Sequence, residues 1–162
     1  GEKDAESASN ETTRGKKESK DSVDALGDDF GNYTDSDVDA QFEAALKDSR
    51  GMHIHQRRIA LSLSLGCVAL VEDYLNSLKI LKPGCQINHQ WFKKKKENVK
   101  KLIETKVISS IEKDEKFDKF LDIIFQIEKE RNELAYGKRT SEEKIKKEIS
   151  LFFELKKGVE NA

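Results

Sequence analysis

The stretch IALSLSLGCVALVEDYL, residues 59–75, decides the fold of this chain. Drawn as a helix, it is apolar around nearly its whole circumference near the middle, and strict alternation typical of an exposed strand does not persist beyond it. A helix of this kind must be enclosed by other elements. We therefore predict a central core helix from about Met52 to Ile80.

Helical spacing of apolar residues extends outward from this stretch in both directions. The chain is broken clearly at Lys82-Pro-Gly-Cys85, where proline and glycine favour a turn. Cap signals and apolar stripes predict further helices after Asp37 up to Gly51, from Ile87 to Val107, from Asp114 to Ala135, and from Thr140 or Ser141 to Val159. The predicted fold is all-α, a four- to five-helix up-and-down bundle.

Charge divides the chain into two unlike parts. Residues 1–40 hold 12 acidic and 5 basic side chains, a net charge of −7, whereas residues 41–162 hold 19 acidic and 25 basic ones, a net charge of +6. The first 36 residues contain too few apolar side chains to offset the entropy of ordering the chain. We expect a disordered acidic tail over 1–36, which could solubilise the protein, screen its basic part or repel nucleic acid, followed by a helical domain over 37–160.

The two cysteines and the absence of long apolar runs favour a cytoplasmic protein. Cys67 and Cys85 are too few and too far apart for a disulfide framework or a zinc knuckle, so we expect reduced thiols. No signal segment opens the sequence, and the run Ile59–Leu65 is much shorter than the roughly 20 residues of a membrane span.

The common motifs of metal and cofactor enzymes are missing from the sequence. His53 and His55 are two residues apart, a spacing that points them to different sides of a helix, and His89 stands alone. There is no glycine-rich phosphate loop, no nucleophile elbow and no CxxC pair. We therefore predict neither a metal site nor a cofactor.

Arg131 is an anomaly on the helix predicted over 114–135. One face of that helix holds Phe117, Phe120, Ile124, Ile127, Arg131 and Leu134. A buried unpaired charge is expensive, so this guanidinium needs an acidic partner, a subunit seam or a cleft that binds an anion. Glu72 interrupts the apolar face of the core helix in the same way and is a candidate partner. Arg131 could also form an ordinary salt bridge that sets helix register, or bond helix-end carbonyls and reach water.

The sequence around this arginine, Glu130-Arg-Asn-Glu-Leu-Ala-Tyr-Gly137, resembles the signature of the HEPN superfamily, the higher eukaryotes and prokaryotes nucleotide-binding domains. Members end a core helix with Arg-Asn, a few variable residues and then His, often followed by Gly. The residues that fit this pattern are Arg131, Asn132, Leu134, Ala135 and Gly137, and Tyr136 stands in the place of the usual His. The resemblance extends over roughly residues 40–158.

The resemblance implies a homodimer and a metal-independent ribonuclease in which residues of two subunits converge on one cleft. Arg131 would stabilise charge developing on a phosphate, Asn132 would bond that phosphate or hold the helix end, and Glu72 belongs to the same candidate catalytic set. Tyr136 is a poor general base at neutral pH because a phenol has a pKa of about 10. It could be a packing aromatic, a binding residue in a site that no longer cleaves, or a catalytic proton donor.

A basic stretch offers a second candidate surface. Trp91 precedes Lys93, Lys94, Lys95 and Lys96, and Lys100 follows one turn later. Base stacking on the indole combined with phosphate contacts to the lysines would bind RNA, although lysine runs on helices are often only solvated faces.

We therefore expect a HEPN-like dimer that binds RNA or a nucleotide, with possible ribonuclease activity in a toxin-antitoxin or defence setting and an antitoxin or other protein as partner. The competing hypothesis is a non-catalytic bundle that dimerises through an apolar seam and recruits a partner. A third is a small-molecule pocket between the helices.

Overall fold

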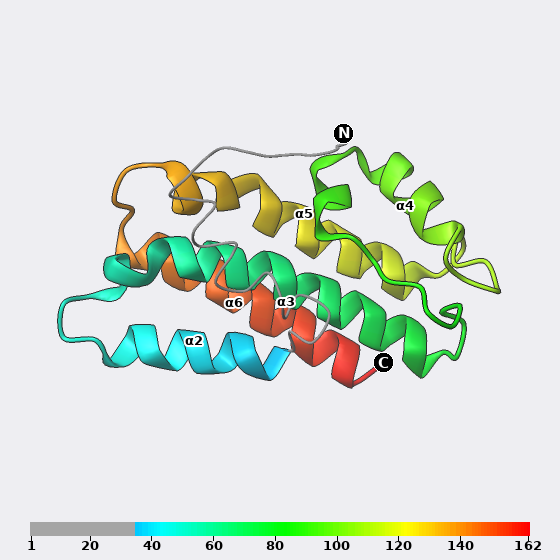
Figure 1. The fold of residues 1–162 in the computed structure, drawn as a ribbon, viewed down its shortest axis with the longest axis horizontal. Helices are drawn as coiled ribbons and strands as arrows, with labels where there is room; N and C mark the ends of the chain where they lie inside the picture. The colour runs from blue at the N-terminus through cyan, green and yellow to red at the C-terminus, as the bar shows by residue number, and fades with distance from the viewer. Residues whose placement is uncertain (1–34) are drawn as a thin grey trace. The chain divides into compact units, whose positions relative to one another are not determined.

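Four long helices run side by side in alternating directions over residues 35–162, which are the residues that the computed structural model describes (Figure 1). They are α2 (Asp35–Lys47), α3 (Gln56–Ser77), α5 (Glu115–Tyr136) and α6 (Glu142–Glu160). The connections contain η2 (Met52–His55), η3 (His89–Lys93) and α4 (Lys96–Glu104). The all-helical prediction is confirmed for this part of the chain. The predicted acidic tail lies outside it, except for its last two residues, which begin α2.

Helix α3 is the centre of the core, as its composition predicts. It packs against α2, α5, α6 and η3, and every residue from Ile59 to Cys67 is buried. Each large apolar side chain so buried contributes about 1.5–3 kcal/mol. Together with η2, this is the one helix of the described residues that is long and apolar enough to cross a membrane. Because 72% of its apolar window is buried within the bundle, it is compatible with a core helix of a soluble protein.

The predicted starts of the last two long helices are confirmed by their caps. Asp114 accepts a hydrogen bond from the backbone N–H of Phe117 at 3.0 Å, and Ser141 accepts one from the N–H of Lys144 at 3.2 Å. Each cap satisfies a helix N–H that has no partner within its own helix. These caps fix where α5 begins and where the chain turns from α5 into α6.

The core helix ends three residues earlier than predicted. Helix α3 stops at Ser77, and Lys79 adopts a left-handed conformation with φ of 60°. The N–H of Ile80 then bonds to the carbonyl of Leu75 at 3.1 Å, which closes the helix end. Glycine is the usual residue in this conformation, so the sequence carries no signal for the stop.

The prediction of one amphipathic helix over 87–107 is wrong. Residues 89–93 form a 3-10 turn, the backbone is extended at Lys94 and Lys95, and only Lys96–Glu104 is α-helical. The side chain of Asn88 caps the 3-10 turn by accepting from the N–H of Gln90 at 2.8 Å. Val107 is not helical and pairs with Leu81 in an isolated antiparallel bridge. The split frees η3 to pack against both α3 and α5.

A close approach of three helices requires the glycine in the middle of α3. A Cβ atom built on Gly66 would lie 2.6 Å from Cγ2 of Val38 on α2 and 2.7 Å from Cε1 of Phe152 on α6. Real Cβ atoms essentially never approach that closely. Both neighbours are fully buried, so neither can move aside freely.

We predict that Gly66→Ala destabilises the fold by about 1–3 kcal/mol, because the added methyl overpacks the junction of α2, α3 and α6. Thermal or urea unfolding followed by circular dichroism measures this. The control is Asn76→Ala on the exposed end of α3, which should change stability by less than about 0.5 kcal/mol. Equal stability of Gly66→Ala and the wild type would contradict the observed packing.

Candidate functional site

Arg131 lies where its helical position predicts, on the buried stripe of α5. Its exposed fraction is 7%, and the apolar residues of the same stripe, from Phe117 to Leu134, are buried around it. A guanidinium that is more than nine-tenths buried has lost most of its hydration. The question is what replaces that hydration.

Hydrogen bonds within the protein replace only part of the lost hydration of Arg131. Arg131 donates from Nη1 to Oδ1 of the neighbouring Asn132 at 3.1 Å. Its Nε is buried and has no hydrogen-bond partner. Among residues 35–162 it forms no ion pair. Asn132 thus positions the arginine, and one donor of the guanidinium remains unsatisfied.

Glu72 is not the partner that the sequence predicts for Arg131. Its Oε2 accepts a hydrogen bond from the backbone N–H of Ile87 at 2.7 Å. Burial raises the pKa of Glu72, and the bond from Ile87 acts in the opposite direction. This carboxylate therefore anchors the segment that leads into η3, and the predicted pairing across the bundle is wrong.

The carboxylate that does act on Arg131 is Glu128, one turn earlier on α5. Burial raises the pKa of Glu128, whereas the positive charge of Arg131 and a hydrogen bond from Ser64 lower it. The Ser64 hydroxyl donates to Oε2 of Glu128 at 3.0 Å. Glu128 is thus held by α3 and compensates Arg131 electrostatically without forming an ion pair with it.

His89 and Lys93, at the two ends of η3, also act on this region. The pKa of His89 is lowered to about 4, chiefly by burial and then by the positive charges of Arg131 and Lys93. Lys93 is exposed and also lowers the pKa of Glu128. His89 therefore lies within electrostatic range of Arg131, a cation that is no metal ligand.

The segment that carries His89 is anchored on both sides. Ile87 is 4% exposed and its N–H is bonded to Glu72, while Phe92 is 3% exposed and packs edge-on against Phe125 of α5, with ring centroids 6.1 Å apart. These contacts hold η3 against α3 and α5. The position of His89 is thus set by buried neighbours rather than by an exposed loop.

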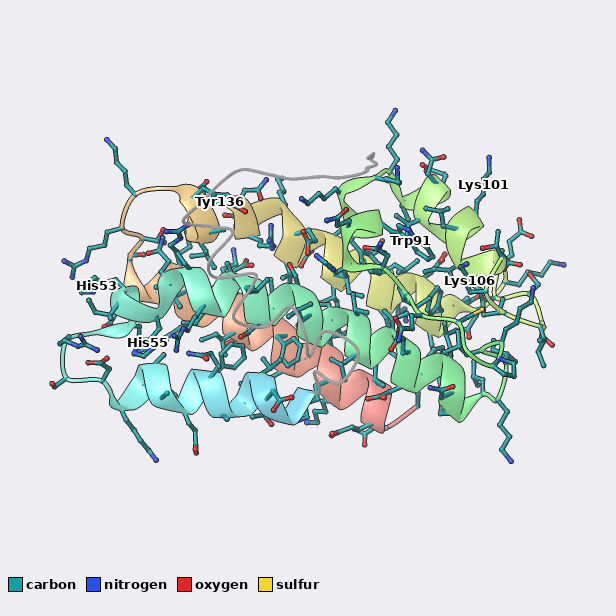
Figure 2. All side chains as sticks on the ribbon, in the orientation of Figure 1. His53, His55, Trp91, Lys101, Lys106 and Tyr136 are labelled. Atoms are coloured by element: carbon teal, nitrogen blue, oxygen red, sulfur yellow. The ribbon has the colours of Figure 1, made fainter. Side chains whose placement is uncertain are left out.

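Tyr136 does not share this site. It is 63% exposed, so its interpretation as a packing aromatic is wrong. Five residues advance an α-helix by about 140° around its axis, so Tyr136 and Arg131 face different directions. Figure 2 shows Tyr136 at the end of α5, well separated from Trp91 of η3 along the bundle. Within one chain the motif does not bring its arginine and its aromatic residue together.

The end of the motif helix is held by a residue that sequence reasoning missed. The buried Gln56 donates from Nε2 to the carbonyls of Leu134 at 3.1 Å and Lys138 at 3.2 Å, and its Oε1 accepts from the N–H of Thr140 at 2.9 Å. A Cβ atom on Gly137 would lie 2.6 Å from the carbonyl oxygen of Glu133, so glycine is required there. Both residues fix the turn that follows α5.

The predicted nucleic-acid-binding residues fall into two groups. Lys96 and Lys100 of α4 pair with α5, through Asp122 at 2.8 Å and Asp118 at 2.7 Å, and so attach α4 to the bundle. The side chains of Lys93, Lys94 and Lys95 are exposed, and Trp91 is partly buried against the core. Of the exposed lysines, Lys93 acts on the pKa of His89, whereas the paired lysines have a structural role in this chain.

A second buried charge, Glu148 of α6, was also missed. Its exposed fraction is 1% and its Oε1 has no hydrogen-bond partner. Burial is the largest cause that raises its pKa, to about 7, and Glu130 adds to the effect. Glu148 lies on the apolar stripe of Ile145, Ile149 and Phe152, so the test that singles out Arg131 in the sequence would also have found it.

Nδ1 of His53 is buried without a hydrogen-bond partner, whereas His55 and the cysteines have ordinary surroundings. Nε2 of His55 lies 2.8 Å from Oδ2 of Asp48, which also pairs with Arg50 at 2.8 Å. Cys67 is buried and Cys85 partly buried, and both are free thiols. No cluster of three or more metal-ligating side chains occurs within the described part of the chain.

Comparisons with known proteins identify no family for this chain. No protein-family model matches the sequence, and no significant match was found among curated proteins or among solved structures. Any functional assignment therefore depends on the side chains around Arg131 and on the resemblance of its motif.

We predict that Glu148→Gln stabilises the protein at about pH 8 by roughly 2–3 kcal/mol but has little effect near pH 4. The pKa of Glu148 rises from 4.5 to about 7 on folding, so below 4.5 the carboxyl is protonated in both states. As the pH rises to 7, ionisation favours the unfolded chain, and above 7 the full penalty is present. Glutamine removes that penalty.

Urea unfolding of both proteins across this pH range measures the difference. The matched control is Glu154→Gln, an exposed position on the same helix, which should leave stability nearly unchanged at both ends of the range. A difference between Glu148→Gln and the wild type that does not vary with pH would contradict the buried environment of this carboxyl.

Proposed function

We propose that this chain is a HEPN-like RNA- or nucleotide-binding protein in which Arg131 contacts a phosphate group. The observation that carries the proposal is a guanidinium only 7% exposed, without an ion pair among residues 35–162 and with an Nε that lacks an acceptor. A buried donor left unsatisfied costs about 1–3 kcal/mol. An anion that accepts a hydrogen bond from it recovers that energy.

Phosphate is the anion that suits these residues best. The planar fork of arginine matches two phosphate oxygens, and charge-assisted bonds of this type are stronger than neutral ones. The exposed Lys93, Lys94 and Lys95 extend the positive charge away from Arg131 along the chain. Lysines in such a row attract a polyanion without reading its sequence.

Binding is favoured over cleavage within one chain. Cleavage by a 2′-hydroxyl needs a group near the phosphate that exchanges protons around neutral pH. Tyr136 faces away from Arg131, and burial lowers the pKa of His89 to about 4. A ribonuclease site of the kind that the resemblance implies would require a homodimer in which Tyr136 of the partner subunit reaches Arg131.

The proposal predicts that Arg131→Met weakens binding of a short single-stranded RNA at low salt by about ten- to hundredfold, the loss expected for a charged hydrogen-bonded contact. Methionine keeps most of the buried side-chain volume. Fluorescence anisotropy with labelled RNA measures binding, and circular dichroism confirms that the variant is folded.

The matched control is Arg58→Met on α3, an exposed arginine outside the site, which should weaken binding by less than about threefold. Equal losses for the two variants would show only a general effect of charge and would contradict a specific role for Arg131. Absence of RNA and nucleotide binding by the wild type at low salt would overturn the proposal.

A further inference from the structure

We propose that the connection between α3 and α5 binds the surface of an anionic lipid bilayer. Its exposed lysines would contact the lipid phosphates, while Leu78 and Ile108 would enter the bilayer interface. The proposal concerns a different surface from the one around Arg131 and does not depend on the proposed function. It rests on the distribution of charge, on two exposed aliphatic side chains and on the hydrogen bonds that hold them in place.

Positive charge is concentrated in the connection between α3 and α5. With histidine counted as neutral, residues 78–113 hold ten basic and three acidic side chains, a net charge of +7. The rest of the described chain, residues 35–77 and 114–162, holds 15 basic and 19 acidic side chains, a net charge of −4. An anionic surface is therefore attracted to the connection and not to the long helices.

Most lysines of the connection have no carboxylate partner. Lys96 and Lys100 pair with α5, as described above. Glu104, one of the three acidic residues, is engaged within the connection, where it accepts hydrogen bonds from the N–H of Ile111 at 2.8 Å and the hydroxyl of Ser110 at 3.1 Å. The lysines that are exposed and form no ion pair with residues 35–162 are Lys79, Lys82, Lys93, Lys94, Lys95, Lys101 and Lys113.

A short antiparallel pairing places two lysines opposite each other. The N–H of Lys82 bonds to the carbonyl of Lys106 at 2.8 Å, next to the bridge between Leu81 and Val107. Val107 is 6% exposed and faces the core, so the alternation of an extended segment turns Lys106 away from the core. Like charges directly opposite each other repel. Nζ of Lys82 donates to the carbonyl of Thr105 at 3.2 Å, which supplies a hydrogen bond but no negative charge.

The same pairing holds an exposed isoleucine beside these lysines. The N–H of Ile108 bonds to the carbonyl of Ile80 at 2.8 Å, and the side chain of Ile108 is 65% exposed. Residues two apart in an extended segment lie on one face, so Ile108 shares its face with Lys106. Leu78, which is 43% exposed, lies two residues before Ile80 at the end of α3. The connection thus presents aliphatic and positively charged side chains together.

This surface lies far from the end of the motif helix. Figure 2 shows Lys101 and Lys106 toward one end of the bundle and Tyr136 and His53 toward the other. A bilayer bound at the lysine end would therefore leave the turn after α5 accessible.

The aliphatic side chains favour a bilayer over a nucleic acid. Exposed lysines alone attract any polyanion. Bases stack on aromatic rings, however, and Trp91 of the connection is partly buried against the core. A bilayer interface accepts leucine and isoleucine at the level of the acyl chains while lysines reach the phosphates with their long side chains.

The experiment measures sedimentation of the full chain with two kinds of vesicle, one of phosphatidylcholine alone and one of phosphatidylcholine mixed with phosphatidylserine. The variants are Ile108→Ser, Leu78→Ser, and Lys79→Gln combined with Lys82→Gln. All four positions are exposed, so the core is not disturbed. Circular dichroism confirms that each variant is folded.

The matched controls lie together on α2. Leu46 is an aliphatic residue that is 60% exposed, and Lys47 beside it is an exposed lysine. Leu46→Ser and Lys47→Gln therefore repeat the two kinds of change outside the connection. Each should alter vesicle binding by less than about twofold, because charges act on a membrane only at short range.

We expect the wild type to bind the phosphatidylserine vesicles at least about tenfold more tightly than the neutral ones, and more weakly as salt is added. The double lysine variant should lose about ten- to thirtyfold in affinity, since each lysine near an anionic surface contributes about fivefold. Ile108→Ser and Leu78→Ser should each lose about threefold or more, because each removes an aliphatic side chain that enters the interface.

Four results would overturn the proposal. They are absence of binding to the phosphatidylserine vesicles at low salt, equal binding to both kinds of vesicle, and losses in the α2 controls as large as those in the connection. The fourth is a double lysine variant that loses binding to single-stranded RNA but keeps binding to vesicles, which would make the connection a nucleic-acid surface.

Discussion

The enclosure of α3 is the constraint on which the rest of this structure depends. Because its middle is apolar on every side, α2, α5, α6 and η3 must all pack against it. The polar residues of the same helix are therefore buried as well and need hydrogen-bond partners in the interior. Gln56 bonds to carbonyls at the end of α5, Ser64 donates to Glu128, and Glu72 accepts from the N–H of Ile87. Each bond fixes a different part of the candidate site: the turn after the motif helix, the carboxylate beside Arg131, and the segment that carries His89.

The helical elements could be predicted from the sequence because their signals are local. Apolar spacing and the cap residues Asp114 and Ser141 identified both long C-terminal helices to within a residue or two. The prediction of one helix over 87–107 is wrong because the geometry of this segment depends on contacts with residues far away in the sequence. Phe92 packs on Phe125, the N–H of Ile87 bonds to Glu72, and Val107 pairs with Leu81. Periodicity within the segment carries no information about these partners, so a continuous helix was the natural but wrong prediction.

For the candidate site too, the sequence predicts what depends on local spacing and misses what depends on nonlocal contacts. The position of Arg131 on a buried stripe follows from helical spacing alone, and the structure confirms it. The approach of His89 does not follow, because it requires the break before α4 and the anchoring of η3, neither of which has a sequence signal of its own. The prediction that Glu72 pairs with Arg131 is wrong for a related reason. Facing apolar stripes indicate that two helices pack together, but they do not specify which positions lie at the same height along the bundle.

The difference between Arg131 and the other cations is what favours a ligand over a structural role. Arg50, Lys96 and Lys100 each have a carboxylate oxygen within 2.8 Å, although all three are more exposed than Arg131 and have less need of one. Glu128 is one turn from Arg131, a spacing that readily allows an ion pair on a helix. Instead its Oε2 accepts a hydrogen bond from Ser64, and the guanidinium is left with Asn132 and an unsatisfied Nε. The serine of the core helix therefore contributes to keeping the arginine free of an internal ion pair. A purely structural arginine gains nothing from that arrangement, whereas the proposed anion site needs a guanidinium without an internal carboxylate partner.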